Sequence, residues 1–129
     1  MSIWRQVVTK IAFSLWNKRI APVFDVARNL WIVETDENDI IGQSGKRFAT
    51  DDTQDRALRL TTLQVDQLVC GAITRSSSEV LAEHGIRVIS FIAGELEQVI
   101  QAWLSDNLKD GHLAMPGCSR GKRRSAQRY

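Results

Sequence analysis

The order of hydrophobic and polar positions predicts a chain that opens with strands and then alternates helices with strands. Short apolar runs that partly alternate with polar residues and are closed by polar segments are typical of strands. The run at residues 68–73 is almost entirely apolar, which indicates a strand buried on both faces. The expected strands cover residues 11–16, 30–34, about 40–48, 68–73 and 87–92.

Three helices are expected from capping signals and from helical spacing. Residues 50–53 offer oxygens that can cap a helix amino terminus, and Ser76 with Glu79 fits a capping box. Gly85 fits the position that ends the second helix, and His84 beside it suits a helix carboxyl terminus. The third helix has the strongest amphipathic pattern. Its apolar positions are Leu96, Val99, Ile100, Trp103, Leu104 and Leu108.

The resulting order, βββαβαβα, indicates an α/β fold with one mixed five-stranded sheet. The link at residues 36–39 is short and rich in Asp and Asn, so the second and third strands should form a hairpin. The later alternation implies parallel strands joined by right-handed crossovers. We expect the sheet order 3-2-1-4-5, with strand 2 antiparallel, helices on the faces, and a loop at residues 17–28.

Length and charge divide the chain into one domain and a tail. The 129 residues suit a single domain at 1–108, because the periodic pattern ends at Leu108. The net charge is +2, but five basic residues and no acidic residue lie in the last eleven positions, which leaves 12 basic and 15 acidic groups before them. Residues 109–129 are therefore expected to be a flexible basic tail, and the domain itself is not expected to bind nucleic acid.

The sequence shows neither a membrane span nor a secretory signal. No apolar run approaches the ~18 residues that a membrane helix needs. The first residues do not combine a basic region with an apolar core. We therefore expect a cytoplasmic protein in which Cys70 and Cys118 are free thiols.

The two cysteines stand in different surroundings. Cys70 lies in the apolar run and is expected to be a core residue. Cys118 lies in the basic tail, where positive charge lowers a thiol pKa, so it is either a metal or cluster ligand or an unspecialised thiol. His112, six residues earlier, could supply a second ligand, although this spacing fits no standard zinc pattern. Core positions are also expected for Trp16, Trp31 and Trp103.

Several stretches together carry a family resemblance. In the first loop, Pro22, Phe24 and Ala27 match a family segment of the type Pro-His-Phe-Gly-Arg-Ala. The other matching stretches are residues 10–14, 30–34, 69–73, 82–88, 95–104 and 115–118. On these residues the chain, roughly from 10 to 108, resembles the dinitrogenase iron–molybdenum cofactor biosynthesis family, of the NifX and NifB C-terminal domain type. The resemblance implies a ribonuclease H-like fold with three layers. The chain departs from the family at Val23, Asp25 and Val26, which replace the family's His, Gly and Arg.

The resemblance also implies a function and a site. It implies a non-enzymatic protein that binds or carries an iron–sulfur or molybdenum–iron–sulfur cluster, a cofactor-assembly or acceptor protein as partner, and a monomer or weak dimer. Such clusters are anionic, and open α/β sheets bind ligands beyond the carboxyl ends of their parallel strands. Segments 17–28, 71–76 and 92–95 should meet there, with basic side chains, a helix start that attracts anions, and glycines that permit close approach. The expected cofactor-binding residues are Lys18, Arg19, Phe24, Arg28, Gly71, Arg75, Ser76 and Gly94.

Two alternatives come from other classes of protein. A nuclease on a ribonuclease H-like fold needs carboxylates on its first strand, and residues 11–16 contain neither Asp nor Glu. No Gly-x-Ser-x-Gly, Walker-type or Gly-x-Gly-x-x-Gly motif is present either. A regulatory or protein/RNA interaction module with a contacting arginine tail stays open, because one scaffold can carry different sites.

Overall fold

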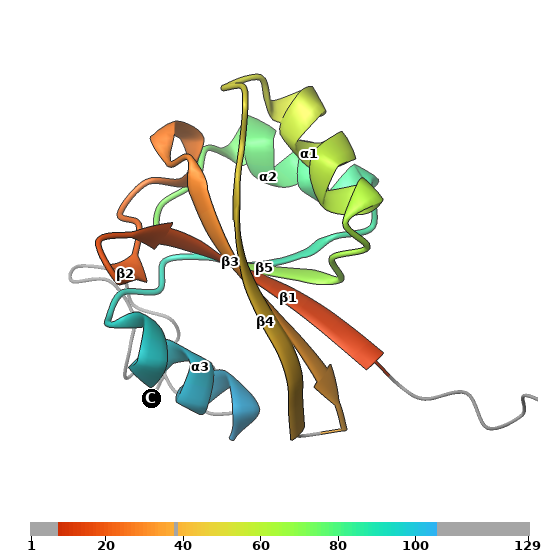
Figure 1. Cartoon of the computed structure of the whole chain (residues 1–129). Helices are drawn as coiled ribbons and strands as arrows, with labels where there is room; N and C mark the ends of the chain where they lie inside the picture. Colours follow the sequence, from red (N-terminus) through yellow and green to blue (C-terminus); the bar gives the residue numbers. More distant parts are fainter. Residues whose placement is uncertain (1–7, 38, 106–129) are drawn as a thin grey trace, which may run out of the picture.

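The computed structural model describes residues 8–37 and 39–105, which form one sheet with helices on both faces (Figure 1). The strands are β1 (Val8–Trp16), β2 (Arg19–Ile20), β3 (Asn29–Asp36), β4 (Asp39–Arg47), β5 (Gln67–Val69) and β6 (Arg87–Ile89). The helices are α1 (Thr53–Thr62), α2 (Arg75–Glu83) and α3 (Leu96–Leu104), and one 3-10 turn, η2, covers Phe24–Val26. The expected mixed α/β architecture is confirmed.

The sheet has the order β4-β3-β1-β5-β6, and the short strand β2 pairs with β1 outside this path. The central strand β1 runs antiparallel to β3, with Phe13 opposite Trp31, and parallel to β5, with Phe13 opposite Val69. β3 and β4 form the expected antiparallel hairpin, and β5 and β6 are parallel. The carboxyl ends of β1, β5 and β6 therefore lie at one edge of the sheet.

Alternating side chains of β1 supply two separate hydrophobic layers. Ala12 points to the face covered by α1 and α2, where Leu60 and Leu81 are fully buried. Phe13 points to the opposite face, where Val99 and Ile100 of α3 pack on the sheet. Figure 1 shows α1 and α2 together on one side of the sheet and α3 on the other. No helix in the described part of the chain is long and apolar enough to cross a membrane.

Several element boundaries differ from those expected. The strands expected at 68–73 and 87–92 are only three residues long, because the chain turns away after Val69 and Ile89 to pair with other loops. The segment expected to be a loop at 17–28 contains β2 and η2. The third helix ends at Leu104, and Leu108 lies outside the described residues, as do the expected boundary at 108 and the tail at 109–129.

The helix ends confirm some capping predictions and correct one. Asp52 caps α1 within the expected segment, with its side chain accepting from the backbone N–H of Gln54. The capping box at Ser76 is wrong, because Thr74 is the N-cap of α2 and accepts from the N–H of Ser77 at 3.2 Å. Gly85 has a φ of +80° and follows the last turn of α2, as expected.

The tryptophans do not all lie in the core. Trp31 and Trp103 are half-buried, and their indole N–H groups donate to Gln43 and Gln67 at 2.9 and 3.1 Å. Trp16 was expected in the core, but its position at the end of β1 leaves it 55% exposed. An exposed tryptophan at the carboxyl edge of the sheet indicates a candidate binding surface there.

Candidate functional site

Segments 17–28, 71–76 and 92–95, which were expected to meet at the carboxyl edge of the sheet, are joined there by backbone hydrogen bonds. The N–H of Ala72 donates to the carbonyl of Pro22, and the N–H of Phe24 donates to the carbonyl of Ala72, both at 2.8 Å. On the other side, the N–H of Ile20 donates to the carbonyl of Gly94 at 3.0 Å. The first loop is therefore held between the segments that follow β5 and β6.

Gly71 allows the first loop to approach β5. A Cβ atom at this position would lie 2.5 Å from the carbonyl oxygens of both Ala21 and Pro22. Real Cβ atoms do not come that close to backbone oxygens, so only glycine fits here. The expected close approach at Gly71 exists, but the approaching group is the protein's own backbone, and the residue is not open to a ligand.

The amino terminus of α2 already holds a carboxylate. Asp25 accepts hydrogen bonds from the backbone N–H and the hydroxyl of Thr74, at 2.9 and 3.0 Å, and from the hydroxyl of Ser77. A helix amino terminus favours an anion, and here the anion is the carboxylate of Asp25 from the same chain. Ser76 follows Thr74 in the first turn, so the expected anion site at this helix start is filled by Asp25, a residue whose role the sequence did not reveal.

The hydrogen bonds to Asp25 also set its pKa. Burial works to raise the pKa of this carboxyl group, but the bonds from Ser77 and Thr74, aided by Arg56, outweigh it. The net result is a pKa below the ordinary 3.8. The charged form of Asp25 is therefore the form that ties the first loop to α2.

We expect Asp25→Asn to lower the free energy of unfolding at neutral pH by about 1–2 kcal/mol, because charge-assisted bonds to the helix start are weakened. Since the folded-state pKa lies below 3.8, the contribution of Asp25 is present above that pH and is lost as the pH falls through the folded-state pKa. The difference in the free energy of unfolding between wild type and variant should therefore become smaller at acidic pH. Urea unfolding at a series of pH values measures it, and a difference that does not change with pH would contradict this role.

Arg56 is a second functional residue that the sequence analysis missed. Its side chain is only 1% exposed, and it donates to the carbonyl oxygens of Phe24 at 2.8 Å and of Thr50 at 2.9 Å. The guanidinium carbon lies 5.3 and 4.5 Å from the ring centres of Phe24 and Phe48. Burial lowers the pKa of Arg56, and the neighbouring carboxylate of Asp51 opposes that shift. Arg56 therefore fixes the position of η2 through its hydrogen bond to the carbonyl of Phe24.

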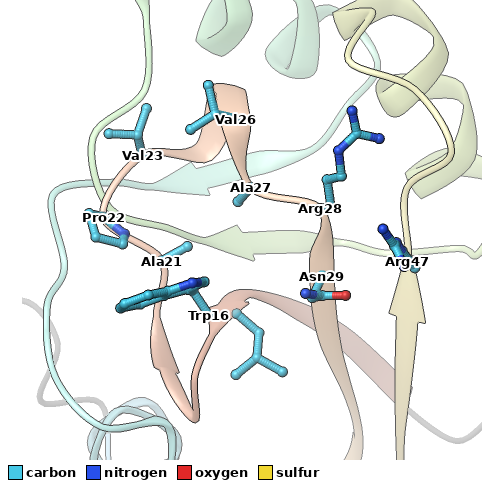
Figure 2. A pocket seen from close by; sticks show the side chains of 10 residues that line it. Trp16, Ala21, Pro22, Val23, Val26, Ala27, Arg28, Asn29 and Arg47 are labelled. Atoms are coloured by element: carbon cyan, nitrogen blue, oxygen red, sulfur yellow. The ribbon is translucent and has the colours of Figure 1, made fainter.

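The loop held in this way forms one wall of a groove of about 440 Å³. Figure 2 shows Trp16, Pro22 and Val23 on one side of the groove and Arg28 and Arg47 on the other. The lining residues are Leu15, Trp16, Ala21, Pro22, Val23, Val26, Ala27, Arg28, Asn29 and Arg47. The groove therefore combines apolar walls with two guanidinium groups at one end.

A second cavity, of about 350 Å³, lies next to the groove and shares Trp16 and Pro22 with it. Arg19 and Gly94 line this second cavity. Lys18 lines a further hollow together with Arg19 and the acidic residues Glu95 and Glu97. Trp16 is thus a ridge between two cavities, with Arg28 on one side and Arg19 on the other.

The structure places the expected site residues in different surroundings. Arg28 lies in the groove, where it also pairs with Asp51 at 3.1 Å. Phe24 is 1% exposed and packs in the core against Phe48, so its side chain does not face the groove. Arg75 is exposed and pairs with Glu79 at 3.4 Å on the surface of α2.

Metal-ligating groups are scarce at this edge. Among residues 8–37 and 39–105, no three His, Cys, Asp or Glu side chains are grouped so as to hold a metal ion. Cys70 is buried, as expected, and burial together with nearby Asp25 raises the pKa of its thiol to about 12. His84 makes the expected helix-end contact, with Nδ1 2.9 Å from the carbonyl of Val80. Cys118 and His112 lie outside the described residues.

Comparison with known proteins relates the chain to one family and to several solved structures. The sequence model of the family described as "Dinitrogenase iron-molybdenum cofactor" matches residues 7–106. No curated protein matches the chain. The crystal structure of PH0822 aligns with a TM-score of 0.71 and 16% identity, over 76% of this chain and 90% of that one.

Two further structures have similar folds. A protein of Methanocaldococcus jannaschii (MJ0327), provisionally named a dinitrogenase, aligns with a TM-score of 0.63 and 15% identity, over 78% of this chain and 92% of that one. A Thermotoga protein (TM1290), provisionally named a NifB protein, aligns with a TM-score of 0.60 and 17% identity, over 92% and 99%. At such identities the likeness concerns the fold alone.

Proposed function

The chain belongs to the dinitrogenase iron-molybdenum cofactor family, and on that premise we propose that it binds and carries an iron–sulfur or molybdenum–iron–sulfur cluster without transforming it. The observation that carries the proposal is the groove beside Trp16, with Arg28 and Arg47 at one end. Its volume of about 440 Å³ falls within the range of small-molecule sites. On this proposal, the ribonuclease H-like sheet serves as a scaffold for binding.

The groove suits an anionic cluster for electrostatic reasons. Metal–sulfur clusters carry negative charge, and guanidinium groups donate strong charge-assisted hydrogen bonds. The apolar side chains of Trp16, Val23 and Val26 would exclude water on the opposite wall, which strengthens these interactions. Arg19 adds positive charge on the far side of Trp16.

On this proposal, residues 8–37 and 39–105, which contain no group of three ligating side chains, hold the cluster by charge and shape. Val23 stands at the family's histidine position and lines the groove with an apolar side chain. The side chain of Cys70 is fully buried and does not line the groove. Metal ligands would then come from Cys118 or His112, or from the cofactor-assembly or acceptor protein that exchanges the cluster. Binding that rests on arginines and shape is readily reversed, as transfer requires.

An anaerobic binding experiment with matched variants tests the proposal. Protein purified without oxygen is analysed for iron and molybdenum and titrated with tetrathiomolybdate, a simple anion of molybdenum and sulfur. The double variant Arg28→Gln/Arg47→Gln should bind this anion about 2- to 30-fold more weakly, because two exposed charge contacts of roughly 0.2–1 kcal/mol each sum to roughly 0.4–2 kcal/mol. The control is Arg59→Gln/Arg87→Gln, which removes the same charge from the ends of α1 and β6 at the opposite edge of the sheet.

The two variants separate the groove from general electrostatics. The control should bind like the wild type. Equal weakening in both variants would mean that only net charge attracts the anion, and the groove would not be the site. Protein that is colourless, free of iron and molybdenum, and unchanged by the anion would favour a regulatory or interaction module instead.

A further inference from the structure

The strand β4 forms a long, open edge of the sheet. It covers nine residues, seven of them exposed, and within the described part of the chain it pairs only with β3. The opposite edge, β6, is only three residues long. An open edge presents unpaired backbone N–H and C=O groups that can pair with another strand. In the sheet order β4-β3-β1-β5-β6, β3 separates β4 from β1 and β5.

The devices that protect an edge strand stand at the two ends of β4, with a bulge at one end and Lys46 and Arg47 at the other, and leave the middle of the strand without them. A bulge inserts Ile41 between Ile40 and Gly42, and Ile41 is 54% exposed. Beyond the bulge, Gly42 to Arg47 pairs regularly with β3. This stretch contains no proline, and its first four residues carry no charge. Edge strands that must stay single usually carry such features along their length.

Charge is distributed along β4 with opposite signs at its two ends. Asp36, Glu37 and Asp39 make the hairpin end acidic, and Lys46 and Arg47 make the other end basic. Among the described residues, none of the ion pairs involves Lys46 or Arg47. An identical strand laid antiparallel along β4 would place each acidic end beside a basic end, whereas a parallel strand would place like charges together.

From this complementarity we propose that the chain forms a symmetric dimer in which β4 pairs antiparallel with β4 of a second copy. The two-fold axis passes at Ser44, the centre of the uncharged regular stretch, so that both bulges lie outside the paired region. The two sheets then join into one continuous sheet across the interface. The interface shares Arg47 with the proposed groove, but its test is the oligomeric state, which does not require that the groove bind a cluster.

Sedimentation velocity with charge-reversal variants tests the interface. The wild-type chain should show a concentration-dependent dimer that weakens at high salt. In this register Asp39 lies diagonally across from Arg47 of the other copy, within reach of a long side chain. Asp39→Arg and Arg47→Asp should each weaken the dimer by about 5- to 30-fold, because both symmetric diagonal contacts turn repulsive. The combined variant should regain most of the wild-type affinity. A wild type that stays monomeric at every concentration, or a combined variant that fails to recover, would overturn the proposal.

Cross-linking tests the register. In a Cys118→Ser background, Ser44→Cys should form a disulfide dimer on oxidation, because directly opposed Cβ atoms lie about 4.5–5.5 Å apart. The control is Lys46→Cys, which the proposed register separates from its own copy by about four residues, or roughly 14 Å. Equal cross-linking of the two variants would overturn the proposed register and the symmetric pairing with it.

Discussion

The substitution Arg56→Met is expected to lower the free energy of unfolding by about 2–4 kcal/mol, because the carbonyl of Thr50 loses the guanidinium donor and the carbonyl of Phe24 keeps only the N–H of Ala27. Arg56 donates to the carbonyls of Phe24 and Thr50, and its guanidinium group lies close to the rings of both Phe24 and Phe48. Methionine has a similar length but offers no donor and no charge to either ring. Urea unfolding followed by circular dichroism measures the change.

A matched variant on the same helix separates this role from a general effect of losing an arginine. Arg59→Met removes an exposed arginine of α1 and should change stability by less than about 0.5 kcal/mol. Equal stability of the Arg56→Met and Arg59→Met variants would contradict the assigned contacts. Because Arg56 supports η2, the wall of the groove, Arg56→Met should also weaken binding of tetrathiomolybdate under conditions where the variant is fully folded.

The second large effect is expected for Gly71→Ala, which should lower the free energy of unfolding by about 3 kcal/mol or more. The added Cβ would meet two carbonyl oxygens at 2.5 Å, so the first loop must move away from β5. That movement breaks the two hydrogen bonds that join Ala72 to Pro22 and Phe24. Thermal and urea unfolding would both report the loss.

Gly45→Ala is the control for this second substitution. A Cβ at Gly45 meets the Trp31 ring at 3.6 Å, which is an ordinary contact on an exposed strand. This variant should be close to wild type or slightly more stable, since alanine restricts the unfolded chain. A Gly71→Ala variant as stable as Gly45→Ala would show that the first loop packs less closely on β5 than the structure indicates.

The main elements of the fold were predictable because their signals are local. Strand alternation in β1 and helical spacing in α3 reflect burial on one side of an element, and each signal is complete within about ten residues. Positions expected to be buried, such as Cys70 and Ile100, are buried. The errors fall where an element depends on distant partners. β2 is a two-residue strand that pairs with the end of β1 just before it, a signal too short to predict. Both β2 and η2 are also held by backbone contacts to segments some 50 to 75 residues later in the chain.

The candidate site was predictable in its location but not in its electrostatics. Loops converge beyond the carboxyl ends of parallel strands, and this rule predicted that residues 17–28, 71–76 and 92–95 lie together. Backbone contacts join these segments in the structure. It could not tell which charges are free. Arg28 is paired with Asp51 and Arg75 with Glu79, and the start of α2 is filled by Asp25. Arg56 could have been noticed, because it lies four residues before Leu60 on the buried face of α1.

The sequence by itself determined the α/β class, the hairpin, the final amphipathic helix and the edge at which the loops converge, because periodicity and turn chemistry act between near neighbours. Only the tertiary structure decided which side chains face that edge. Trp16 is exposed at that edge, and Phe24 is buried in the core. Gly71 lies where the backbone after β5 contacts the backbone of the first loop. The physical reason is that exposure and charge pairing depend on groups far apart in the chain, whose meeting is set by how the layers pack.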